Sequence, residues 1–94
     1  MKFKLGQVVA TPGCLQVLKE AGQTPSDFLG RHANGDWGDL DDADKQENDL
    51  ALESGGRIFS AYHTTTNTKI WVITEAIGPD GQRASTCLLL PDEY

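Results

Sequence analysis

Cysteine is scarce in this sequence, with two in 94 residues, and no apolar run approaches the roughly 20 residues that a membrane-spanning helix needs. Two cysteines are too few for the disulfide framework of a small secreted protein. Residues 1–13 contain two lysines but only an interrupted apolar run, without the hydrophobic segment and cleavage site of a signal peptide. These absences predict a cytoplasmic protein with no membrane partner.

Basic residues are also few, with eight against fourteen acidic residues and a formal net charge of −6. A protein that neutralises many phosphates carries the opposite balance, so a nucleic-acid partner is disfavoured. The hydrophobic content of 38% is enough for one compact core, and 94 residues is the length of one small domain. We therefore expect a single acidic domain spanning residues 1–94.

Apolar spacing and turn residues predict the elements in the first half of the chain. Residues 2–10 show the alternation and β-branching of a strand. The Thr-Pro pairs that begin at Thr11 and Thr24 are typical helix starts, with threonine as the N-cap and proline at the first helical position. A third helix is expected from about residue 40, capped by Asp39.

The second half has a different character. Three runs rich in Ile, Val, Thr and aromatic residues, at residues 57–63, 69–76 and 84–90, are separated by short turn sequences. Short connections favour antiparallel neighbours, which predicts a three-stranded antiparallel meander. The whole order predicts an α+β fold: an N-terminal strand, two to three short helices and then the meander, with the helices packed on one sheet face.

The central run, residues 69–76, has apolar residues on both of its faces. In a strand, Ile70 and Val72 point to one side, and Trp71 and Ile73 point to the other. Such a strand is either covered on both sides or uses its second face as an interface, which would also suit a homodimer.

Most of the acidic charge lies in residues 36–53, which hold eight acidic residues against one lysine. The local charge is −7, so the rest of the chain sums to +1. A calcium-binding loop beginning at Asp42 is disfavoured because Glu47 stands where an EF-hand needs glycine. The segment is interpreted either as a solvated helix face or as an acidic surface that binds a basic partner.

Trp37 lies at the start of this segment, in the sequence Gly-Asp-Trp-Gly. The two glycines predict a tight turn that holds Trp37 either against the core or outward as an anchor in a protein interface. The candidate partner-binding residues are Trp37 and the neighbouring carboxylates Asp36, Asp39, Asp41, Asp42 and Asp44.

An enzymatic alternative relies on the two histidines. Small toxin or ribonuclease-like enzymes need a base, an acid and a cation that binds phosphate. The candidate residues for such a site on the sheet face are His32, Arg57, His63 and Glu75. Each of these residues also has a purely structural interpretation. His32 would be a half-buried side chain that is hydrogen-bonded to the backbone or to Asp36, and the other three would lie on an ordinary strand surface.

Motifs for metals and cofactors are missing, so the sequence predicts no cofactor and no metal site. Cys14 falls in the first turn of a predicted helix, where the helix dipole would lower its pKa, and Cys87 falls within a strand. Both cysteines are interpreted as small buried apolar residues.

Several segments along the chain are distinctive: GQVVATPG (6–13), RH (31–32) followed by GDWG (35–38), SGGRI (54–58), SAY (60–62), IWVITEA (70–76) and LLPDEY (89–94). Through them the sequence resembles a group of small uncharacterised bacterial proteins found on plasmids, integrative elements and genomic islands. The resemblance implies a cytoplasmic accessory protein of a mobile genetic element and implies no particular activity. Together with the residues above, it favours a non-enzymatic protein-interaction module over the ribonuclease-like alternative.

Overall fold

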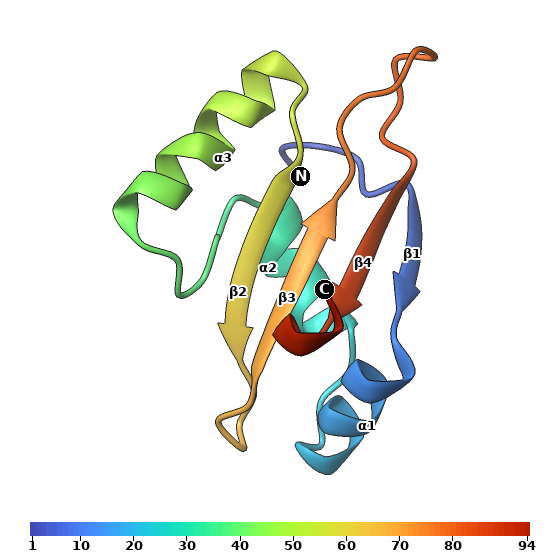
Figure 1. Ribbon diagram of the computed structural model, residues 1–94, viewed down its shortest axis with the longest axis vertical. Helices are drawn as coiled ribbons and strands as arrows, with labels where there is room; N and C mark the ends of the chain where they lie inside the picture. The colour runs from blue at the N-terminus through green and yellow to red at the C-terminus, as the bar shows by residue number, and fades with distance from the viewer.

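Three helices and a four-stranded sheet make up the computed structural model, which describes residues 1–94 (Figure 1). The helices are α1 (Pro12–Glu20), α2 (Ser26–Ala33) and α3 (Asp42–Ser54), and a 3₁₀ turn, η1 (Pro91–Glu93), follows the last strand. The strands are β1 (Gln7–Ala10), β2 (Ile58–His63), β3 (Lys69–Thr74) and β4 (Ser85–Leu89). The predicted α+β class is confirmed. None of the helices has the length and apolar character needed to cross a membrane.

The sheet is mixed, and its strand order is β1-β4-β3-β2. β2 and β3 run antiparallel, as do β3 and β4, but β1 pairs parallel with β4 and places Val9 opposite Cys87. The predicted three-stranded antiparallel meander is therefore not confirmed, because the sheet has four strands and includes a parallel pair. Local sequence patterns miss the β1–β4 pairing because nearly the whole chain lies between the two strands.

Side-chain caps begin α1 and α3, whereas α2 begins after Pro25 with no side-chain capping hydrogen bond, so the predicted Thr24 cap is wrong. The hydroxyl of Thr11 accepts a hydrogen bond from the N–H of Cys14 at 3.2 Å and starts α1 as predicted. Helix α3 starts two residues later than predicted, because its N-cap is Asp41, whose carboxylate accepts from the N–H of Asp44 at 2.8 Å. Gly55, with a φ of 82°, ends α3 in the left-handed conformation that glycine favours.

Helices α1 and α2 cover one face of the sheet, and Figure 1 shows α2 behind the strands. Their apolar residues and the facing strand residues form the main core: Cys14, Leu18, Phe28, Tyr62, Ile70, Val72 and Leu88. Helix α3 instead lies alongside β2 at the edge of the sheet. The expectation that the helices pack on one sheet face therefore describes α1 and α2 but not α3.

Two buried polar side chains fasten α3 to the sheet. The amide of Asn48 donates to the carbonyl of Phe59 at 2.5 Å and accepts from the N–H of Phe59 at 3.0 Å, as a neighbouring strand would. The guanidinium of Arg83 donates to the carbonyls of Gly56 at 2.6 Å and Ala51 at 3.3 Å, at the end of the helix. These bonds hold the acidic helix along the β2 edge of the sheet.

Candidate functional site

The sheet face opposite α1 and α2 carries aromatic side chains that are only partly covered. Phe59 on β2 and Trp71 on β3 meet edge to face, with their ring centroids 5.0 Å apart. The turn η1 brings Tyr94 onto the same face, where its ring lies 5.8 Å from Trp71. The guanidinium of Arg57 lies 5.4 Å from the centre of the Tyr94 ring.

Two cavities adjoin on this face, because Phe59 and Trp71 line both of them. The first has a volume of about 210 Å³ and is otherwise lined by Arg57, Ile73 and Tyr94. The second has a volume of about 340 Å³ and is otherwise lined by Asp39, Leu40, Asp41, Asp44, Ala61 and Lys69. We call the two cavities together the open-face groove; it has an apolar end and an acidic end.

Trp37 lies outside this groove, and its interpretation as an exposed anchor needs correction. Only 5% of its surface is exposed, its ring stacks on Phe3 at 6.2 Å, and its indole N–H donates to the carboxylate of Asp49 at 3.1 Å. The loop turns Trp37 inward at Gly38, whose φ is 75° and where any Cβ would overlap the carbonyl of Ala61. Trp37 is a core residue.

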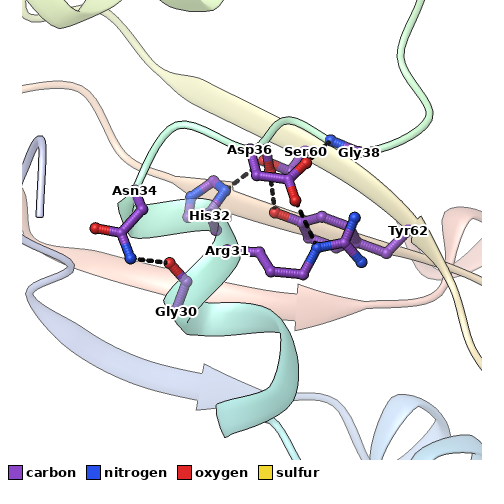
Figure 2. A network of polar contacts seen from close by, with 8 residues as sticks. All are labelled: Gly30, Arg31, His32, Asn34, Asp36, Gly38, Ser60 and Tyr62. Carbon is purple, nitrogen blue, oxygen red and sulfur yellow. Dashed lines mark hydrogen bonds and ion pairs between the residues drawn. The ribbon is translucent and has the colours of Figure 1, made fainter.

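Asp36 holds this loop in place through both its side chain and its backbone, as Figure 2 shows. Its carboxylate accepts from Arg31 at 2.7 Å and from the N–H of Gly38 at 3.1 Å, while its carbonyl accepts from the hydroxyl of Tyr62 at 2.6 Å. The hydrogen bond from Arg31 lowers the pKa of Asp36. Asp36 is therefore engaged within the chain and does not line the groove.

The other four predicted carboxylates differ in how free they are. Asp39 accepts from His63 at 2.7 Å, and Asp41 caps α3, yet both also line the acidic end of the groove. Asp42 and Asp44 lie exposed in the first turn of α3, and their carboxylates make no hydrogen bond or ion pair within the chain. Of these two, Asp44 lines the groove.

His32 is completely buried on the helix-covered side of the sheet, in a chain of hydrogen bonds. Its Nδ1 lies 2.6 Å from the hydroxyl of Ser60, and its Nε2 lies 2.8 Å from the hydroxyl of Thr74. The Thr74 hydroxyl contacts that of Thr86 at 2.6 Å, and Thr86 donates to the carbonyl of Leu5 at 2.7 Å.

The carbonyl at the end of this chain determines the direction of every bond in it. Because a carbonyl only accepts, Thr86 donates to it, Thr74 donates to Thr86, and Nε2–H of His32 donates to Thr74. Nδ1 is then the acceptor of the Ser60 hydroxyl proton. The imidazole is neutral in this arrangement, and burial lowers its pKa to about 4.

The structure does not assemble the four residues of the ribonuclease-like alternative. His32 has no exposed surface with which to contact a substrate. Arg57 and Glu75 extend the facing ends of β2 and β3, next to the Ile58–Thr74 pair. His63 is the last residue of β2, at the opposite end of the strand from Arg57. At the rise per residue of an extended chain, the two residues are roughly 20 Å apart. These positions do not form one catalytic site.

Sequence reasoning missed Phe59 and Tyr94 in the groove, although it identified the second apolar face of β3. The signal for Phe59 was present, since alternation along residues 57–63 places it on the Trp71 side of the sheet. Tyr94 has no such signal, because only the tertiary path of η1 carries it across the sheet. Asn48 and Arg83 were missed because their partners are backbone groups distant in sequence.

No group of three or more His, Cys, Asp or Glu side chains is arranged to hold a metal ion. Comparison with known proteins found no matching family model, no matching curated protein and no matching solved structure.

Proposed function

We propose that this chain is a non-enzymatic protein-interaction module whose open-face groove binds a basic segment of another protein. The observation that carries the proposal is the junction at Phe59 and Trp71, where an apolar cavity meets a cavity lined by carboxylates. An apolar side chain of the partner would fill the first cavity. Lysine or arginine side chains next to it would face Asp41 and Asp44 in the second.

The aromatic end supports a protein as the partner. Tryptophan and tyrosine are enriched at the centres of protein interfaces, where they contribute a large contact area with few rotatable bonds. Trp71 is held edge to face between Phe59 and Tyr94, so this surface is organised before a partner arrives. Organisation in advance reduces the entropy that binding would otherwise cost.

The charge distribution supports a basic partner. The acidic end of the groove is built from the first part of residues 36–53, the segment that carries a charge of −7. Lys69 is the one basic residue that lines that cavity. A concentrated negative field accelerates encounters with a cationic surface, and added salt screens it.

The biological setting implied by the resemblance, an accessory protein of a mobile genetic element, is compatible with this activity. In that setting the module would act by occupying a basic surface on another protein. No catalytic step is required, in keeping with the separation of His32, Arg57, His63 and Glu75.

A titration followed by NMR tests the proposal with two synthetic peptides of equal length. One peptide has a central leucine flanked by lysines, and the other has glutamates in place of the lysines. We expect the lysine peptide to shift the amide signals of Phe59, Trp71 and Asp44, and to bind at least tenfold more tightly than its counterpart. Equal affinities, shifts on another surface, or no binding at millimolar concentration would contradict the proposal.

Variants of neighbouring residues separate contact in the groove from net charge. Trp71→Ala should abolish binding of the lysine peptide. Asp44→Asn should weaken binding of this peptide by about threefold to tenfold. Asp42→Asn should have a smaller effect, because it removes the same charge from a residue in the same helical turn that does not line the groove. Equal effects of the two asparagine variants would show that only the overall charge matters.

A further inference from the structure

The two edge strands of the sheet, β2 and β1, differ in whether their outward-facing backbone groups are hydrogen-bonded. On the β2 edge, the Asn48 side chain bonds both backbone groups of Phe59. On the same edge, Ala61 donates to the carbonyl of Trp37 at 3.2 Å and accepts from the N–H of Asp39 at 2.7 Å. The outward-facing backbone groups of Phe59 and Ala61 are therefore all paired.

The β1 edge has no such cover. In its parallel pairing with β4, the N–H groups of Gln7 and Thr11 donate to Ala84 and Leu88, both at 3.0 Å. Because successive residues of a strand face opposite edges, the backbone groups of Val8 and Ala10 point away from the sheet. No backbone or side-chain hydrogen bond within the chain reaches them.

The side chains of β1 also lack the features that keep an edge strand unpaired. Its four residues, Gln7–Ala10, include no charged residue and no proline. Val8 and Val9 expose 42% and 41% of their surface, although both are β-branched and apolar. Natural proteins usually protect such an edge with lysine, proline or a covering segment.

We propose that two copies of this chain pair through their β1 strands, antiparallel, with Val9 of one copy opposite Val9 of the other. The register follows from the outward-facing backbone groups. Val8 of each copy exchanges both N–H to C=O hydrogen bonds with Ala10 of the other copy. The two-fold axis then passes beside Val9, and the two sheets become one continuous sheet. This inference does not depend on the proposed function, because the open-face groove stays uncovered.

Two copies of this acidic chain repel each other, and the β1 edge is where that repulsion is weakest. Each copy carries a net charge of −6, and residues 36–53 account for the acidity. That segment lies on the β2 side, three strand spacings or about 14 Å from β1. Pairing through β1 places the two acidic segments at opposite ends of the assembly, whereas pairing through the β2 edge or the groove would bring them together.

Sedimentation equilibrium on charge-swapped variants tests both the dimer and its register. Val9→Lys alone and Val9→Glu alone should each weaken self-association at least tenfold, because like charges would face each other at the axis. An equimolar mixture of the two variants should restore it, because the lysine of one copy then faces the glutamate of the other. Added salt should strengthen association of the unmodified chain by screening the repulsion between two acidic molecules.

Leu50→Lys is the matched control, since Leu50 is an exposed apolar residue of α3 on the opposite edge, with 60% of its surface exposed. It should leave self-association unchanged, as should Trp71→Ala in the groove, and circular dichroism would verify the fold of every variant. The proposal is overturned if the unmodified chain is monomeric at millimolar concentration, if Leu50→Lys or Trp71→Ala weakens the dimer as much as Val9→Lys, or if mixing fails to restore association.

Discussion

On the sheet face that α1 and α2 cover, the hydroxyl groups of Ser60 and Thr74 are completely buried beside His32. On the opposite face, the rings of Phe59 and Trp71 remain partly exposed. The covered face therefore buries a few polar groups within its apolar core, and the open face leaves aromatic rings in contact with solvent; both depart from the usual preference. The buried polar groups are tolerated because each has a hydrogen-bonding partner, and the exposed rings form a surface that suits a partner molecule.

The two tryptophans give the sharpest test of this comparison, because each belongs to a different side. Trp37→Ala should lower the free energy of unfolding by about 3–5 kcal/mol, since it leaves a cavity beside Phe3 and His32 and removes the bond to Asp49. Trp71→Ala should cost roughly half as much or less, because its ring already contacts solvent. Urea unfolding measures both, and equal losses would contradict the distinction between the two sides.

The buried histidine predicts how stability depends on pH. The pKa of His32 is about 4 in the folded chain and near 6.5 when unfolded, so the unfolded state binds a proton first as the pH falls. The contribution of His32 to the free energy of unfolding is fully present above pH 6.5. It falls by about 3 kcal/mol as the pH is lowered from 6.5 to 4.

Urea unfolding across this pH range, on the unmodified chain and on His32→Gln, measures that loss. The variant should be less stable at pH 7 and should show a flatter dependence between pH 6.5 and 4. Trp71→Ala is the control, because it changes no titratable group and should keep the slope of the unmodified chain. A slope that persists in His32→Gln would contradict the role of the buried imidazole.

The two cysteines provide the mildest test, because they too lie on opposite sides. Cys14 is completely buried, and burial raises its pKa to about 11, although the sequence suggested a lowered pKa at a helix N-terminus. Cys87 is partly exposed, and burial raises its pKa as well. Alkylation at pH 8, followed by mass spectrometry, should modify Cys87 at least tenfold faster than Cys14. Comparable rates would indicate that α1 opens readily.

Much of the local structure follows from patterns that neighbouring residues share. The Thr11 cap, the proline after it and the apolar alternation of β3 depend on contacts within a few residues, so they can be recognised without the fold. The exact first residue of a helix is harder to predict than its existence. Several aspartates precede α3, and Asp41 rather than Asp39 accepts the capping hydrogen bond from the helix backbone.

The candidate site shows a similar division. Acidic residues 36–53 and the second apolar face of β3 could be identified from the sequence, and both contribute to the open-face groove. The sequence could not show that these two features adjoin at Phe59 and Trp71, because that contact depends on α3 lying along the edge of β2. The direction in which Trp37 points was likewise undetermined, since a Gly-Asp-Trp-Gly turn can present its ring to the core or to solvent.

By itself, the sequence determined the α+β class, the acidic segment and the start of α1, because these depend on composition, periodicity and short-range hydrogen bonds. Only the tertiary structure decided that β1 pairs parallel with β4, that His32 and Trp37 are buried, and that Tyr94 reaches the open face. Each of these depends on contacts between residues far apart in the chain. Such contacts form only where a particular side chain finds both space and a partner for its polar groups.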